Sequence, residues 1–283
     1  MKWERDKMGI KVVSDSASDL LNLDGVDFSV ASLTIITDER QYVDDANLDV
    51  EQMAVELQNY KGRSSTACPG VGAWLDAFGD AKEVIVFTIT GTLSGSYNSA
   101  CLAKKDYEEE HPDRKVFVID SLSAGPEITL LIEKTAEYIK EGKSFEDICA
   151  QITEYQKRTK LLFILESLVN FANNGRVSPV VAKATGLLGI RIVGEASEQG
   201  DLSVLDKSRG EKKALSTLVN HMKQFGYKGG KVSIGHCANE SATLKLKGMI
   251  LSEFPEAQIE FHPLRGLCSF YAEKGGILVG CEC

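Results

Sequence analysis

The sequence predicts an α/β protein in two parts: an N-terminal parallel sheet covered by helices, and a C-terminal α+β part with a mixed or antiparallel sheet. In the first half of the 283 residues, short β-branched runs alternate with amphipathic segments. One run, residues 84–90, is almost entirely apolar, which is typical of a strand covered on both faces. Beyond about residue 160, neighbouring strands are separated by a glycine-containing turn, which is typical of an antiparallel hairpin.

The first half is expected to form a parallel sheet with helical crossovers. Asp49 precedes a segment with apolar residues at helical spacing, which predicts a helix capped by that carboxylate. Parallel strands must be joined by crossover connections, usually helices, so the alternation of strands and helices indicates parallel pairing. The expected strands lie at residues 10–13, 28–36, 84–90 and 116–119, and the expected helices at residues 50–57, 74–78, 95–110 and 127–140.

The second half has a different pattern, and we divide the chain into a first part, residues 1–160, and a second part, residues 161–283. A helix at residues 145–159 precedes the boundary. The turn at residues 198–201 joins two apolar runs and predicts a β-hairpin. The expected strands of this part lie at residues 161–165, 190–193, 202–205, 231–234, 258–261 and 277–279, and a helix is expected to end at residues 173–175.

Composition limits the classes of partner. The 32 basic and 41 acidic side chains leave a formal net charge of −9, which repels the nucleic-acid backbone. The sequence has no run of about 18 apolar residues and no signal-peptide pattern at its start. The seven cysteines follow no metal-ligand spacing. We therefore expect a cytoplasmic protein with reduced thiols, no metal, no nucleic-acid partner and no stable membrane insertion.

Three common catalytic or nucleotide-binding motifs are incomplete. Residues 142–144 read Gly-Lys-Ser, like the end of a P-loop, but Glu137 stands where the first glycine is needed. This glycine is instead expected to end one helix, and Ser144 to cap the next. The dinucleotide fingerprint that starts at residue 70 breaks at Leu75, and the serine-hydrolase motif G-x-S-x-G fails around Ser94. The four histidines lie in no metal or protease motif.

A polar turn after the apolar strand is the strongest candidate for a binding site. Ser94 is a good helix cap, Gly95 lets a ligand approach the backbone, and Ser96 adds a hydroxyl. The first N–H groups of a helix lack partners inside the helix, and the helix dipole adds positive charge there. A carboxylate or phosphate could dock at this turn, at the strand end where open α/β sheets bind ligands. The sequence is equally compatible with a Ser94 that only caps its own helix.

Two further polar segments are weaker candidates on their own. Residues 63–70 contain three consecutive hydroxyl side chains before a proline, and the simplest interpretation is that they cap the next helix. Arg176 follows a glycine turn, where a solvated arginine is the simplest interpretation.

Several short motifs lie in one order along nearly the whole chain. The most specific is LSGSYNSA at residues 93–100. The others are SDSASDL at 14–20, LTI at 33–35 with YVD at 42–44, SSTA at 64–67, GRVS at 175–178 and KSRGEKKA at 207–214. This ordered set resembles the DegV family of bacterial fatty-acid-binding proteins, in which the most specific motif reads L-S-G-T-Y-x-S-A.

The resemblance implies a fold and a function. It implies an N-terminal three-layer α/β/α domain with a parallel sheet, a C-terminal two-layer α+β domain, and a fatty acid held between them in an apolar tunnel. Its carboxylate would be bound near Ser64, Ser65, Ser94, Gly95 and Cys268. The resemblance also implies a carrier with no cofactor and no chemistry of its own.

The resemblance further implies a protein partner. A separate ATP-dependent fatty acid kinase would phosphorylate the presented carboxylate to an acyl-phosphate that feeds phospholipid synthesis. Arg176 and Arg209 match basic positions of the family and are candidates for docking that kinase or contacting the phosphate.

The sequence departs from the family pattern at three places. Cys268 stands where the family commonly has a histidine near the carboxylate, and a thiol is a weaker hydrogen-bonding group that cannot become a cation. Thr66 and Ala67 replace Gln-Pro, and the aromatic residues Phe270 and Tyr271 either reshape the tunnel or pack in the core. Two alternatives therefore stay open: a binder of another amphipathic acid without a kinase partner, and a phosphotransferase or hydrolase acting at Ser94.

Overall fold

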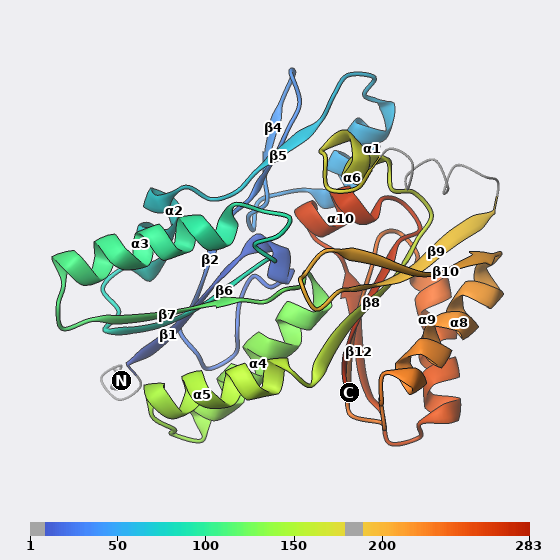
Figure 1. The fold of residues 1–283 in the computed structure, drawn as a ribbon. Helices are drawn as coiled ribbons and strands as arrows, with labels where there is room; N and C mark the ends of the chain where they lie inside the picture. The colour runs from blue at the N-terminus through green and yellow to red at the C-terminus, as the bar shows by residue number, and fades with distance from the viewer. Residues whose placement is uncertain (1–8, 179–188) are drawn as a thin grey trace, which may run out of the picture.

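The structure is a computed structural model that describes residues 9–178 and 189–283. The expectation that the chain starts without a signal peptide therefore falls partly on residues 1–8, which lie outside the described residues. Figure 1 shows two sheets next to each other, one built from the blue-to-green first half and one from the yellow-to-red second half. A small third sheet lies near the top of this view, between helices α2 and α1.

The first sheet confirms the predicted parallel architecture. Its strands pair in the order β2-β1-β6-β7, and every pair is parallel. Helices α2 and α3 pack on one face of this sheet, while α4 and α5 pack on the other (Figure 1), which gives the three layers that were expected. The bounds are β1 Ile10–Asp15, β2 Phe28–Ala31, β6 Glu83–Thr88, β7 Lys115–Asp120, α2 Val71–Phe78, α3 Ser96–Glu110, α4 Pro126–Lys140 and α5 Phe145–Gln156.

Strand β6 explains the apolar run of residues 84–90. Successive side chains of a strand point to opposite faces. Val84 and Val86 pack in the core beneath α2 and α3, whereas Ile85 and Phe87 pack in the core formed with α4 and α5. Because both faces of the sheet are covered, both sets of side chains must be apolar.

The second sheet is mixed, as predicted. Its order is β10-β9-β8-β13-β11-β12, and all neighbours are antiparallel except β11 and β12. The predicted hairpin is the β9–β10 pair. Helices α8 and α9, for which no sequence prediction was made, cover one face. The bounds are β8 Thr159–Leu165, β9 Ile190–Ala196, β10 Leu202–Arg209, β11 Lys231–His236, β12 Gln258–Pro263, β13 Ile277–Glu282, α8 Glu211–Gln224 and α9 Glu240–Glu253.

Helix α4 packs between the two large sheets (Figure 1). It contacts β6 of the first sheet and β8, β11 and β13 of the second. Most of its residues are therefore buried. One helix thus contributes apolar side chains to the first core and closes part of the second sheet's inner face.

The predicted strand at residues 28–36 is wrong in its continuity. The chain leaves the first sheet after Ala31, and β3 (Thr34–Ile36) pairs with β4 (Gln41–Val43) and β5 (Ser65–Ala67) in a small antiparallel sheet. At the break, the Leu33 N–H donates to Ser16 Oγ at 3.0 Å instead of to a neighbouring strand. This contact spans 17 positions and could not be read from local propensity.

The helix caps were predicted with mixed success. Asp49 accepts the Gln52 N–H at the start of α1 (Val50–Asn59), and Ser144 accepts the Asp147 N–H at the start of α5, as expected. The interpretation of residues 63–70 as a cap is wrong, because α2 begins at Gly70 without a side-chain cap. Part of that segment instead forms β5.

The described residues also form three short helical segments, η1, α6 and α10, with bounds Ser16–Ser18, Val169–Asn173 and Gly266–Ala272. Across the described part of the chain, no helix combines the length and apolar character needed to cross a bilayer. In the same residues, no group of three or more His, Cys, Asp or Glu side chains is placed to hold a metal ion.

Candidate ligand-binding site

A cavity of about 320 Å³ lies between the inner face of the mixed sheet and the loops at the carboxyl ends of the parallel strands. This volume is at the lower end of the range of roughly 300–1,000 Å³ for small-molecule sites. Most of the wall is apolar. The larger apolar side chains that line it are Leu33, Ile89, Leu93, Leu161, Phe163, Leu165, Phe171, Leu202, Leu267 and Leu278.

Strand β8 provides much of the apolar wall by simple alternation. Leu161, Phe163 and Leu165 line the cavity, while Leu162 and Ile164 pack against α8 and α9 on the other face. The run at residues 161–165 is therefore apolar on both faces, because one face packs against helices and the other lines the cavity.

The turn before α3 lies at the cavity, with Ser94 and Gly95 in its wall. Ser94 Oγ accepts the Ser96 N–H at 3.2 Å, and the Ser94 hydroxyl proton remains to be donated elsewhere. Ser96 points away from the cavity, because its hydroxyl donates to Asp15 Oδ2 at 2.5 Å. Asp15 also accepts the Ile89 N–H, so a buried carboxylate fixes the end of β6 to the start of the helix.

A cation lies near this turn. Arg176 lines the cavity, and its Nε donates to the Leu93 carbonyl at 3.1 Å, one residue before Ser94. The Cys68 Sγ also lies at this end, 3.2 Å from where a Cβ on Gly95 would be. The cavity thus has a polar end with an arginine, a free hydroxyl and a helix N-terminus, which together favour a carboxylate.

The predicted serines of the first loop lie beside the cavity and do not line it. Ser65 is exposed on β5, and the Ser64 carbonyl accepts from Asn174 Nδ2 at 3.3 Å. The next residue, Thr66, is in the wall, and its Oγ1 lies 2.8 Å from the Tyr271 hydroxyl. Sequence reasoning missed this pair: the run of hydroxyl residues indicated the segment, but only the folded chain shows that Thr66 lines the cavity while Ser64 and Ser65 do not.

The two predicted basic residues are not together. Arg176 lies in the cavity wall, whereas Arg209 is exposed at the far end of β10. Leu202, at the start of that strand, lines the cavity and lies seven positions before Arg209, which is roughly 20 Å along a strand. A single ligand of cavity size cannot contact both.

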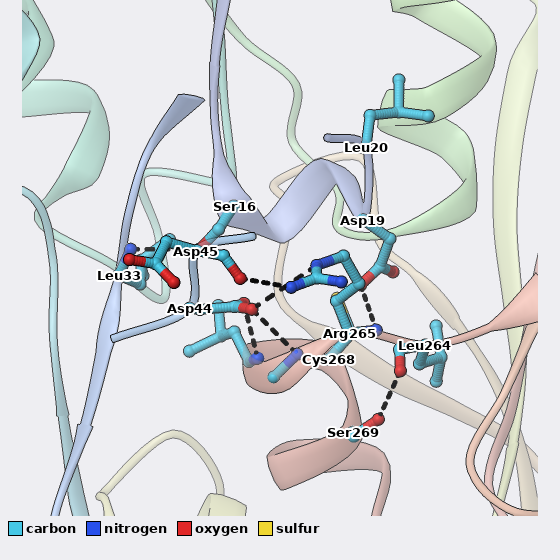
Figure 2. Close-up of polar contacts among 12 residues, drawn as sticks. Ser16, Asp19, Leu20, Leu33, Asp44, Asp45, Leu264, Arg265, Cys268 and Ser269 are labelled. Atoms are coloured by element: carbon cyan, nitrogen blue, oxygen red, sulfur yellow. Dashed lines mark hydrogen bonds and ion pairs between the residues drawn. The ribbon is translucent and has the colours of Figure 1, made fainter. Parts of the chain in front are cut away.

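Cys268 lines the cavity from α10, but its thiol is already occupied. The Sγ donates to the Ala17 carbonyl at 3.5 Å, next to Asp19. Burial raises the pKa of Cys268 well above its ordinary value, so the group stays a neutral thiol. Figure 2 shows Cys268 on α10, the helix anchored by Asp44 and Arg265.

A network of buried carboxylates holds α10 in place (Figure 2). Asp44 accepts the N–H groups of Gly266 and Leu267 at 3.0 and 2.8 Å, and its Oδ1 lies 3.8 Å from Arg265 Nε. The Arg265 N–H donates to Asp19 Oδ1 at 2.8 Å. Burial raises the pKa of Asp19 to about 7, and that of Asp15 likewise to about 7. The sequence showed these carboxylates only as parts of matching motifs.

The hairpin turn of the mixed sheet closes the cavity against the first half of the chain. The Thr92 hydroxyl donates to the Gln199 carbonyl at 2.6 Å. Gly200 lines the cavity at a φ of +80°, and a Cβ there would lie 2.2 Å from the Thr90 Oγ1. Only glycine fits this contact, so the close approach of the turn to the polar loop depends on it.

These features define a class of protein: a parallel α/β unit and a mixed sheet that together enclose one apolar cavity with a carboxylate-compatible polar end. The chain belongs to the DegV family, because the profile described as "Uncharacterised protein, DegV family" matches residues 9–281. A DegV domain-containing protein of Streptococcus pneumoniae is 45% identical over 276 residues, which are 96% of this chain and 98% of that protein.

Solved structures of relatives superpose closely. A DegV family protein from Eubacterium eligens, loaded with heptadecanoic acid, is 46% identical with a TM-score of 0.94, and the match covers 96% of this chain and 99% of that one. The Fatty Acid Kinase (Fak) B3 protein of Streptococcus pneumoniae, loaded with linoleic acid, is 45% identical with a TM-score of 0.95 over the same shares of each chain.

Proposed function

We propose that this protein binds a long-chain fatty acid in the cavity, with the carboxylate at the polar end and the acyl chain against the mixed sheet. The observation that carries the proposal is the combination of an apolar wall with one polar end, where Ser94, Gly95 and Arg176 meet. The fatty acids held by the relatives from E. eligens and S. pneumoniae support the same class of ligand.

The energetics assign different roles to the two ends of the cavity. Burial contributes roughly 0.8 kcal/mol per methylene, so about ten buried methylenes contribute ~8 kcal/mol before the costs of association. The hydrogen bonds to the carboxylate contribute less, because they replace hydrogen bonds to water. The chain therefore supplies most of the affinity, and the polar end sets the orientation of the ligand.

We further propose that the protein is a cytoplasmic carrier that presents this carboxylate to a separate ATP-dependent fatty acid kinase. The two parts of the chain, residues 1–160 and 161–283, would hold the ligand between them. Arg176, close to the Ser94 turn, is suited to steady a developing acyl-phosphate, and the exposed Arg209 is suited to dock the kinase. Ser64 and Ser65 lie at the edge of the same end, and the neutral Cys268 thiol would contact the ligand without charge.

The first test is solvent extraction of the purified, denatured protein followed by mass spectrometry of the extract. We expect one fatty acid per chain, and the delipidated protein should take up palmitate or oleate. A preparation that contains no acyl ligand and ignores both added acids would overturn the proposed function.

The kinase step needs its own test, in which acyl-phosphate formation is measured with an added fatty acid kinase and ATP. Arg209→Ala should raise the carrier concentration needed for half-maximal turnover while leaving fatty acid binding unchanged. Lys228→Ala is the matched control, since it removes an equally exposed cation elsewhere. Equal effects of the two variants would rule out a docking role for Arg209.

A further inference from the structure

We propose that Tyr271 is a ligand-contacting residue, whose hydroxyl donates a hydrogen bond to the carboxylate of the bound acid while accepting one from Thr66. This inference rests on the proposed function and deepens it. It names the hydrogen-bond donor that takes the place of the histidine side chain which the resemblance to the family implies at the position of Cys268. The residue follows three positions after Cys268 on α10 and lines the same cavity.

The ring of Tyr271 is held in one orientation by two aromatic neighbours. The Phe171 ring lies 4.7 Å away at an interplanar angle of 33°, and the Phe270 ring lies 4.9 Å away at 76°. Such offset and edge-on contacts stabilise a ring beyond its burial. The hydroxyl is therefore positioned before a ligand arrives, and its ordering costs no additional entropy on binding.

The Thr66 and Tyr271 hydroxyl groups have two protons, and the hydrogen bond between them uses one. Tyr271 Oη and Thr66 Oγ1 lie 2.8 Å apart, and one of their two protons fills this hydrogen bond. Among residues 9–178 and 189–283, neither hydroxyl has another hydrogen-bond partner. The second O–H is thus available to the cavity. A phenol is a stronger acid than an alcohol, so the favoured arrangement has Thr66 donating to Tyr271 and Tyr271 donating onward.

The hydroxyl pair lies at the polar end of the cavity. Thr66 lies at the centre of β5, and Cys68 is the first residue after that strand. Both line the cavity, and the Cys68 Sγ lies against Gly95. Thr66 is thus two positions from the residue that contacts Gly95, and Arg176, which bonds the Leu93 carbonyl, is close enough for its charge to act on the Tyr271 hydroxyl.

The charges around Tyr271 suit an acidic ligand. Burial raises the pKa of Tyr271, so the hydroxyl keeps its proton at neutral pH, and the nearby positive charge of Arg176 partly offsets this rise. The same positive charge attracts a carboxylate. The Cys268 thiol donates to the Ala17 carbonyl and so offers no proton to the ligand. Tyr271 is thus the residue of α10 that can supply one.

The test compares oleate with oleyl alcohol, which has the same chain but no carboxylate, on delipidated protein. Tyr271→Phe keeps the ring and should raise the Kd for oleate about tenfold to a hundredfold, the range for a lost hydrogen bond to a charged group. Its Kd for oleyl alcohol should rise less than its Kd for oleate, because a neutral hydroxyl accepts a weaker hydrogen bond, and loss of the Thr66–Tyr271 hydrogen bond should lower its thermal midpoint only slightly. Thr66→Val should raise the Kd for oleate less than Tyr271→Phe does.

Tyr227→Phe is the matched control, because it removes a tyrosine hydroxyl that donates to the Gly230 carbonyl outside the cavity. Wild-type protein that does not bind oleate would overturn the proposed function itself. Wild-type binding with an unchanged Tyr271→Phe variant, or an equal loss for oleyl alcohol, would overturn the present inference alone. A larger loss in Thr66→Val would make Thr66 the donor and likewise overturn it.

Discussion

Two helix N-termini near the cavity meet the same physical requirement in different ways. Helix α10 begins against the Asp44 carboxylate, which accepts its first N–H groups at 3.0 and 2.8 Å. Helix α3 begins at Ser96, after a Gly95 that has no side chain to cap it; the Ser96 N–H donates to Ser94 Oγ, and this turn lies at the cavity. In both places a carboxylate would satisfy unpaired N–H groups and the helix dipole. One carboxylate is part of the protein, and the other is the proposed ligand.

The same interaction, a carboxylate at a helix N-terminus, stabilises the fold at α10 and is available for ligand binding at α3. At α10, the Arg265 guanidinium adds an ion pair to Asp44, with Nε 3.8 Å from Oδ1. The Asp44 carboxylate joins segments 222 positions apart, so it fastens α10 and the cavity wall to the first half of the molecule. At α3 the equivalent place is left to solvent or ligand, with Arg176 nearby in the role that Arg265 has at α10.

Removal of the Asp44 carboxylate tests its structural role at the N-terminus of α10. It should have the largest effect of the three changes. Asp44→Ala leaves two helix N–H groups without their partner and removes the carboxylate that faces the Arg265 guanidinium. We expect the free energy of unfolding to fall by about 3–5 kcal/mol, as for the loss of one partner of a buried ion pair. Urea denaturation measures it, with Asp24→Ala, which removes an exposed carboxylate, as control. Equal losses in the two variants would contradict a special role for Asp44.

Removal of the Ser94 hydroxyl, next to the N-terminus of α3, tests the role of this turn in ligand binding. Ser94→Ala should weaken fatty acid binding by about 1–3 kcal/mol, because one hydrogen bond to a charged group is lost. Its free energy of unfolding should change little in the absence of ligand. Isothermal titration with oleate measures the effect, and Ser99→Ala in the same helix is the control. An unchanged affinity in Ser94→Ala would place the carboxylate elsewhere.

The buried carboxylate of Asp19 is the third group of this kind. Its expected effect on stability is the smallest. Asp19 accepts one N–H, that of Arg265, and its second oxygen has no hydrogen-bond partner within the described residues. Burial raises its pKa to about 7 from an ordinary value of 3.8. The folded state then binds more protons than the unfolded state between these values. Stability from this group is therefore present at low pH and is lost as the pH rises through about 7.

The measurement is urea denaturation at pH 6 and pH 8. Over this range Asp19 should lower the free energy of unfolding by about 1 kcal/mol, and Asp19→Asn should remove this share of the pH dependence. Asn also tolerates the left-handed backbone at this position, where φ is +59°. Asp24→Asn, at an exposed position, is the control. A pH dependence that is identical in Asp19→Asn and the wild type would show that this carboxyl does not titrate in the range.

Local signals in the sequence predicted much of the fold. The caps at Asp49 and Ser144 were correct because each involves a contact three residues along the chain. The run at residues 84–90 predicted a strand buried on both faces, since burial on two faces demands apolar residues at every position. The hairpin at residues 198–201 was correct because turn geometry is encoded by its own residues.

Errors in the sequence analysis occurred where distant segments decide the local structure. Residues 28–36 have the propensity of one strand, yet Ser16 binds Leu33 and the chain divides between two sheets. Residues 64–67 looked like a capping loop, yet pairing with β3 makes part of them an edge strand. That strand places Thr66 in the cavity wall together with Ala67, and leaves Ser65 outside it.

The sequence by itself determined the alternation of strands and helices in the first half, the caps at Asp49 and Ser144 and the polar turn at Ser94, because these depend on residues a few positions apart. Only the tertiary structure decided which polar groups share the cavity. Thr66 meets Tyr271 across 205 positions, and Asp44 meets Leu267 across 223. Such contacts follow from the packing of α10 and the small sheet against the two large sheets, and packing is a property of the whole chain that no local pattern contains.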